Sequence, residues 1–154
     1  MLEQTERELV ETFHRALCAQ DYDVIESFLA DDAVWSLGGP VDVLPYCGTH
    51  HGSARIRQVL DREISGTLGR RKIVADSFIA DRGRGALLGR LVGHLRGGET
   101  VSYRIALFFA MCDGKVHEVH VLLDSFDAAE QVIGRRLDVS HDDGEWPHDS
   151  IVPV

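Results

Sequence analysis

The fold is decided by one stretch near the end of the chain, VSYRIALFFAMCDGKVHEVHVLLDSFDAAEQVIG, which covers residues 101–134. A long apolar segment leads into the turn residues Asp113-Gly114, and a second β-prone segment follows. Asp-Gly favours a two-residue hairpin loop, because both loop positions need positive φ angles. The stretch therefore predicts antiparallel strands over Glu99–Cys112 and Lys115–Leu123, with a helix over Ser125–Ile133 after them.

Two more strands are expected before this hairpin, Ile73–Ala80 and Ala86–Arg96, separated by the turn-forming segment Asp81–Gly85. Gly97-Gly98 then offers a second two-residue loop. Loop length fixes the pairing of neighbouring strands. With two residues in each loop, Tyr103 faces Val92 on one side and Asp124 on the other.

The first half of the chain shows helical spacing of apolar residues. The expected elements are a helix over Glu3–Ala19, a helix capped by Asp21 that ends near Asp31-Asp32, a strand over Ala33–Leu37, a loop to Gly52 and a helix capped by Ser53. A chain of 154 residues fits one domain of ordinary size. We assign residues 1–137 to that domain and residues 138–154, which are acidic and lack periodicity, to a C-terminal arm.

Composition limits the kinds of partner. The formal net charge is −9, which argues against nucleic acid or an anionic membrane surface. The N-terminus lacks the basic start and apolar run of a secretory signal, and the three cysteines have no metal-binding or redox spacing. These features predict a soluble, cytoplasmic protein.

Alternation along the strands places apolar residues on both faces of the expected sheet, so both faces need cover. Helices would cover one face, and helix, tail or a second subunit would cover the other; a homodimer is the simplest arrangement. One face also carries Arg90, Tyr103, Glu118, His120 and Asp124 among its apolar residues. A mostly apolar wall with a few polar groups is typical of a small-molecule pocket.

Tyr103 and Asp124 are the predicted catalytic pair, because cross-strand neighbours lie roughly 4.5–5.5 Å apart. Asp124 would act as a general base and Tyr103 as a hydrogen-bond donor to a developing enolate. His120 lies four residues from Asp124 along the strand, roughly 13 Å away, so those two could act only on opposite ends of one ligand. The alternative for Asp124 is an N-cap of the following helix.

Eight further residues are predicted to bind the substrate: Phe13, Trp35, Leu37, Tyr46, Leu60, Arg90, Leu107 and His120. No metal site is predicted, because the adjacent pair His50-His51 has no identifiable third ligand.

Three segments together resemble a known family. They are Asp21–Trp35, Gly48–Gly52 and the closing segment Asp113–Gly134, and they are similar to SnoaL-like polyketide cyclases of the NTF2-like superfamily, which includes ketosteroid isomerase. The resemblance implies an α+β fold of the NTF2-like or cystatin-like type, a cone in which a curved antiparallel sheet packs around N-terminal helices and encloses an apolar pocket. It also implies a dimer, chemistry without a cofactor, and an acid–base role for the aspartate that matches Asp124.

The sequence therefore predicts a cofactor-free acid–base enzyme, a cyclase, isomerase or dehydratase, that acts on a small apolar carbonyl compound. The alternative is a non-catalytic small-molecule-binding or dimerisation domain.

Overall fold

The computed structural model describes residues 2–137, with side chains from residue 5 onward. Its elements, in chain order, are α1 (Leu2–Ala19), α2 (Tyr22–Phe28), β1 (Leu29–Gly38), β2 (Gly48–His51), α3 (Ser53–Gln58), the π-helical turn η1 (Val59–Glu63), α4 (Ile64–Thr67), β3 (Leu68–Asp81), β4 (Arg84–Leu95), β5 (Thr100–Cys112), β6 (Lys115–Leu123) and α5 (Ser125–Ile133). The predicted C-terminal arm, residues 138–154, lies outside the described residues. None of the helices in residues 2–137 is long and apolar enough to cross a membrane.

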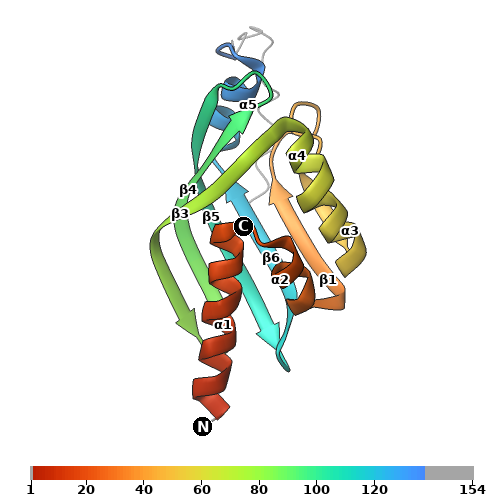
Figure 1. Cartoon of the computed structure of the whole chain (residues 1–154), viewed down its shortest axis with the longest axis vertical. Coiled ribbons are helices and arrows are strands. Elements are labelled where there is room, and N and C mark those ends of the chain that lie inside the picture. Colours follow the sequence, from red (N-terminus) through yellow and green to blue (C-terminus); the bar gives the residue numbers. More distant parts are fainter. Residues whose placement is uncertain (1, 138–154) are drawn as a thin grey trace, which may run out of the picture.

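The six strands form one curved sheet in the order β2-β1-β6-β5-β4-β3. All neighbouring strands are antiparallel except β1 and β6, which run parallel. Helices α1 to α4 lie against one face of this sheet, as Figure 1 shows. The predicted α+β class and the curved sheet around N-terminal helices are confirmed, with one parallel pair in a sheet that was expected to be antiparallel.

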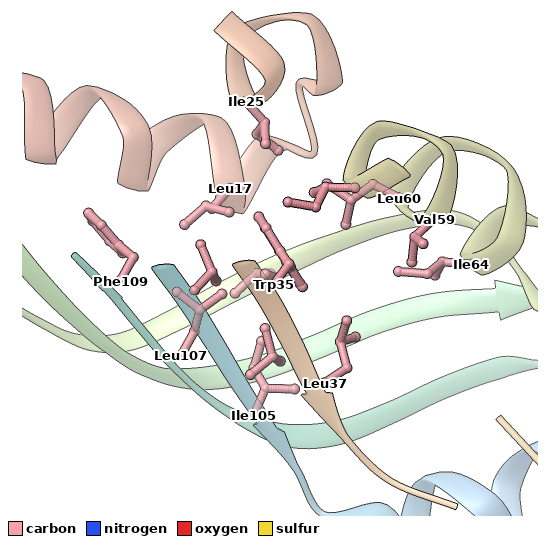
Figure 2. Close-up of a cluster of buried hydrophobic side chains, with 14 of the residues drawn as sticks. Leu17, Ile25, Trp35, Leu37, Val59, Leu60, Ile64, Ile105, Leu107 and Phe109 are labelled. Carbon is pink, nitrogen blue, oxygen red and sulfur yellow. The ribbon is translucent and has the colours of Figure 1, made fainter. Parts of the chain in front are cut away.

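The core lies between the helices and the inner face of the sheet. Figure 2 shows Leu17 of α1 and Ile25 of α2 above Leu60 of η1 and Ile64 of α4 in one cluster. Side chains of β1 and β5 join the same cluster. Asp21 caps α2 as predicted, with its carboxylate accepting from the Val24 backbone N–H at 3.3 Å. This cap satisfies an N–H group at the start of α2, whose Ile25 is buried in the core.

Three expectations for the first half of the chain are wrong in detail. The strand β1 begins at Leu29, so α2 ends earlier than expected. The predicted loop before Gly52 contains the short strand β2, which holds His50 and His51. The cap of α3 is Gly52 with φ 87°, not Ser53, and it makes no side-chain cap bond.

The Asp113-Gly114 loop has two residues as predicted, with φ angles of 50° and 74°. The register beyond it is wrong by one residue, because a β-bulge shifts the pairing between Ala110 and Met111. The backbone N–H of Asp124 consequently bonds to the Arg104 carbonyl at 3.0 Å, and Tyr103 is not its partner.

The loop at Gly97-Gly98 also differs from the prediction. Leu95 N–H bonds to the Glu99 carbonyl at 2.8 Å, which leaves three residues in the loop, and Gly98 takes φ 89°. Tyr103 is therefore paired with Leu91 and not with Val92.

A slip of one residue moves every side chain to the other face of a strand. The inner face carries Leu87, Leu91, Tyr103, Ile105, Leu107, Phe109, Val119 and Val121, whereas Leu88, Arg90, Phe108, His120 and Leu122 lie on the outer face. The predicted grouping of Tyr103 with Arg90, His120 and Asp124 on one face is therefore wrong.

Candidate functional site

An apolar cavity of about 50 Å³ lies between the helices and the inner face of the sheet. Its lining residues are Leu17, Gln20, Ile25, Trp35, Leu37, Tyr46, Leu60, Ile64, Ile73, Leu91, Tyr103, Ile105, Leu107, Val121 and Leu123. Figure 2 shows how several of them, from α1, α2, α3 to α4, β1 and β5, point toward a common space. Gln20, Leu91 and Leu123 are partly exposed, whereas the other lining residues are buried.

Six residues predicted to form the site line this cavity: Trp35, Leu37, Tyr46, Leu60, Tyr103 and Leu107. Trp35 and Leu37 come from alternate positions of β1, and Tyr103 and Leu107 come from β5, so their side chains share the inner face of the sheet. Leu60 belongs to the π-helical turn η1. The sequence thus identifies much of the cavity wall, although it fails to predict the strand register.

Two hydrogen-bonding groups on lining residues are buried without a partner among the described residues. They are the indole Nε1 of Trp35 and the hydroxyl of Tyr46, which makes no hydrogen bond of normal geometry but is close enough to the Tyr103 hydroxyl for each to affect the pKa of the other. Leaving a buried donor unsatisfied costs roughly 1–3 kcal/mol, and such groups in a native fold require an explanation. A bound molecule with an acceptor oxygen would satisfy them.

Both cavity tyrosines are held in their protonated form. Burial raises the pKa of Tyr46. Burial also raises the pKa of Tyr103 far above its usual range, and the neighbouring Tyr46 hydroxyl adds to this effect. Because a raised phenol pKa keeps the proton on the oxygen at neutral pH, both hydroxyls are hydrogen-bond donors there. The same shift makes them poor general bases.

Arg71 lies directly behind one wall of the cavity and is only 7% exposed. Its guanidinium donates to the carbonyls of Leu60, Leu68 and Gly69, to the Ser65 hydroxyl, and to Oε1 of Gln20. Burial lowers the pKa of Arg71, but the guanidinium remains charged because its ordinary pKa is above 12.

Sequence reasoning missed Gln20 and Arg71. The signal for Arg71 is its position two residues before Ile73 in a strand, which places both side chains on one face. Gln20 follows the end of α1 in a left-handed conformation with φ 55°. This conformation is uncommon in residues other than glycine, so it could not be expected from the sequence pattern.

Three of the predicted binding residues lie away from the cavity. Phe13 is fully buried in the core and packs edge-on against Phe109, with 4.8 Å between ring centroids. Arg90 bonds to the hydroxyl and carbonyl of Ser102 on the outer side of the sheet. His120 is also on the outer face, where its Nε2 contacts Glu118 at 2.5 Å.

Asp124 is an exposed N-cap of α5, and its carboxylate is 3.4 Å from the backbone N–H of Asp127. The alternative considered for this residue, a helix cap, is the structural role it has. The predicted direct contact with Tyr103 is wrong, because the bulge in β6 turns Asp124 away from the inner face.

No carboxylate and no imidazole lines the cavity among residues 5–137. His50 is buried nearby, and its Nε2 is hydrogen-bonded to the Tyr46 carbonyl at 2.9 Å. The cavity can therefore enclose an apolar group and donate hydrogen bonds to an oxygen, but its described wall holds no group suited to remove a proton at neutral pH.

Several solved structures are similar to this chain. A candidate isomerase from Rhodopseudomonas palustris is 27% identical, with a TM-score of 0.67 over 81% of this chain and 93% of that one. An NTF2-like protein of unknown function from Burkholderia pseudomallei is 22% identical, with a TM-score of 0.67 over 84% and 95%. An epoxide hydrolase of M. tuberculosis is 20% identical, with a TM-score of 0.65 over 87% and 93%. The last two structures have the same fold as this chain.

Comparison with curated proteins gives no match. A family model of the SnoaL-like domain matches residues 10–119, which is more than half of the chain and includes α2 to β5 with most of the cavity wall. The chain therefore belongs to the SnoaL-like domain family.

Proposed function

We propose that the inner cavity binds a small, mostly apolar molecule through one acceptor oxygen. The observation that carries this proposal is the buried, unpartnered indole N–H of Trp35, with the Tyr46 hydroxyl, in a wall that is otherwise almost entirely apolar. The protonated Tyr103 adds a third donor beside Tyr46. Apolar lining with a few convergent polar groups is the usual composition of a ligand site.

Between the two functions predicted from sequence, the geometry favours the binding domain over the acid–base enzyme. An enzyme that abstracts a proton needs a base within hydrogen-bond reach of the substrate. Asp124, the base expected from sequence, is an exposed helix cap, and the cavity tyrosines hold their protons. A carbonyl ligand held by hydrogen bonds requires no such base.

The cavity volume of about 50 Å³ limits what can be fully enclosed. A water needs about 10–15 Å³ by this measure, and a larger cavity of about 150 Å³ holds a benzene ring. A ligand of more than a few heavy atoms would therefore extend past Gln20, Leu91 and Leu123 toward solvent, or displace those side chains.

Replacing Tyr103 by phenylalanine should weaken binding of a carbonyl probe without weakening that of its hydrocarbon analogue. The probes are cyclopentanone and methylenecyclopentane, titrated by NMR. Loss of one neutral hydrogen bond should weaken ketone binding about 3- to 10-fold. Tyr22→Phe is the matched control, because Tyr22 does not line the cavity, and it should leave both affinities unchanged.

Two outcomes would contradict this proposal. If neither probe binds the wild-type protein inside the cavity, the cavity is not a site for such molecules. If wild type binds the ketone no more tightly than the hydrocarbon, the donors contribute nothing to recognition.

We also propose that the outer face of the sheet is the interface of a homodimer. Five large apolar side chains lie exposed on this side of β3 to β6: Val74, Ile79, Leu88, Phe108 and Leu122. A groove of about 310 Å³ runs among several of them. Large exposed apolar patches commonly mark interaction sites.

Charge on the same face favours a second copy as the occupant. Arg104 and Glu118 are both exposed there, and Glu118 is paired with Ala110, six residues along β5 from Arg104. A two-fold axis near Leu107 would therefore bring Arg104 of each copy toward Glu118 of the other, which gives the self-complementarity that such an interface requires.

The wild-type protein should have twice the chain mass of 17.1 kDa in sedimentation equilibrium at micromolar concentration. Leu122→Glu should shift it to the single-chain mass, because a carboxylate would be buried without a partner in the interface. Val41→Glu is the control, since Val41 is 54% exposed and lies outside the sheet. A wild-type monomer, or a dimer that survives Leu122→Glu, would count against this interface.

A further inference from the structure

Four cations lie together at one end of the outer face of the sheet. Arg90 of β4 is directly paired with Arg104 of β5, so two like charges stand opposite each other. On the neighbouring β3, Arg70 and Lys72 are exposed and point outward, because Arg71 between them points into the core. We call these four cations the basic cluster. Like charges on directly opposed residues are destabilising, so a counter-charge would stabilise this end of the sheet.

The described residues supply no such counter-charge. Arg90 donates to the neutral hydroxyl and carbonyl of Ser102, and the other three cations form no side-chain hydrogen bond or ion pair among residues 5–137. Cations outnumber carboxylates around this end of the outer face and along α5. The carboxylates are Asp76, Glu99, Asp124, Asp127 and Glu130, and the cations are Arg70, Lys72, Arg90, Arg96, Arg104, Arg135 and Arg136. The surface here is therefore net positive, although the whole chain has a net charge of −9.

The C-terminal arm begins beside the basic cluster. Gln131 of α5 bonds to both backbone groups of Ser102, at 2.8 and 2.9 Å, and Ser102 is also the residue that Arg90 contacts. The backbone N–H of Leu137, the last described residue, bonds to the side chain of Glu130 at 2.8 Å. The chain therefore leaves α5 close to the strand that carries half of the cluster's like-charge pair.

The arm has the charge and the length to cover the cluster. Its carboxylates are Asp138, Asp142, Asp143, Glu145 and Asp149, and it has no Lys or Arg, so it holds more than half of the net charge of the chain. Lys72 lies two strand spacings from Ser102, roughly 10 Å. Because an extended chain spans roughly 3.3 Å per residue, about five residues beyond Leu137 cover that distance with length to spare. The carboxylates of residues 142–145 are therefore within reach of β3.

We infer that the C-terminal arm of each chain docks on its own basic cluster, with its carboxylates paired to Arg70, Lys72 and Arg90. This docking is independent of a ligand in the inner cavity and goes beyond the proposed homodimer. In that dimer Arg104 approaches Glu118 of the other copy, whereas Arg70 and Lys72 lie two strands away, farther from the two-fold axis. The second copy then covers the apolar centre of the outer face, and the arm covers its basic end.

The test compares amide NMR signals of residues 142–145 in the full chain with those of a synthetic peptide of residues 138–154. In wild type at low salt the two sets should differ, and about 0.5 M NaCl should move the protein signals most of the way to the peptide positions, because salt screens exposed charges. Arg70→Gln with Lys72→Gln should produce a comparable movement. Arg62→Gln with Arg82→Gln is the matched control, since both are exposed cations without an ion pair among the described residues, and it should leave the signals in place.

A reverse change alters only the arm and leaves the folded domain intact. Asp142→Asn with Asp143→Asn should shift the amide signals of residues 70–74, since the charge that faces them is removed. Unchanged signals in that segment would contradict the inference.

Three further outcomes would overturn it. The first is a wild-type arm whose signals coincide with those of the peptide. The second is an equal shift in both double variants, because the attraction would then be a general effect of net charge. The third uses Leu122→Glu, which should break the proposed dimer: arm signals at the wild-type positions support docking within one chain, whereas signals at the peptide positions would mean that the arm comes from a second copy.

Discussion

Replacing Phe109 by alanine is expected to lower the free energy of unfolding by about 3–5 kcal/mol, the usual range for a fully buried phenylalanine. The ring is 0% exposed, and its centroid lies 4.8 Å from that of Phe13 and 6.4 Å from that of Phe78. It therefore joins α1 to β5 and to β3. Chemical denaturation followed by circular dichroism would measure the change.

The control for this prediction is Phe126→Ala, which removes a ring that is 50% exposed on α5. It should lower the free energy of unfolding far less, by at most about 1 kcal/mol. A second measurement uses Gly85, because a Cβ at that position would lie 2.3 Å from Cζ of Phe109. Gly85→Ala should destabilise the wild type, yet cost much less in the Phe109→Ala background, where the ring is gone. Equal losses for Phe109→Ala and Phe126→Ala would contradict the assigned packing.

The element order could be predicted from the sequence because its signals are local. Asp21 caps a helix, Asp113-Gly114 forms a two-residue loop, and apolar spacing marks the helix faces, each within a few residues. The register could not be predicted, because it depends on where the strands bulge. The bulge beside Ala110 has no distinctive local residue pattern, and the loop after Leu95 holds three residues although Gly97-Gly98 would suit two.

The same limit applies to the candidate site. Trp35, Tyr46 and Tyr103 are found because aromatic residues in or beside strands of this fold tend to face the interior, whatever the exact pairing. The pairing of Tyr103 with Asp124 fails because it depends on the register. Arg71 was missed for a different reason. In the sequence it stands between Arg70 and Lys72, so it looks like part of a solvated basic cluster. Its burial follows only from the alternation of side chains along β3.

Gly89→Ala is expected to lower the free energy of unfolding by about 3 kcal/mol, the upper end of the usual effect of overpacking. A Cβ on Gly89 would lie 2.3 Å from the carbonyl oxygen of Val74 and 3.1 Å from Cα of Ala75, beside the bulge in the pairing of β3 with β4. The clash at Gly85 is with a side chain, whereas both of these neighbours are backbone. Deleting a ring cannot relieve it, so Phe109→Ala should give no rescue here.

Gly89→Ala should also weaken ligand binding, because the clash can be relieved only by moving β3 away from β4. Ile73 and Leu91 are paired across these two strands close to the bulge, and both line the cavity. The measurement is the free energy of unfolding together with cyclopentanone affinity, with Gly97→Ala as control, since a Cβ there meets nothing within 4 Å. If Gly89→Ala is as stable as Gly97→Ala, the close approach of β3 to β4 is not what shapes this wall of the cavity.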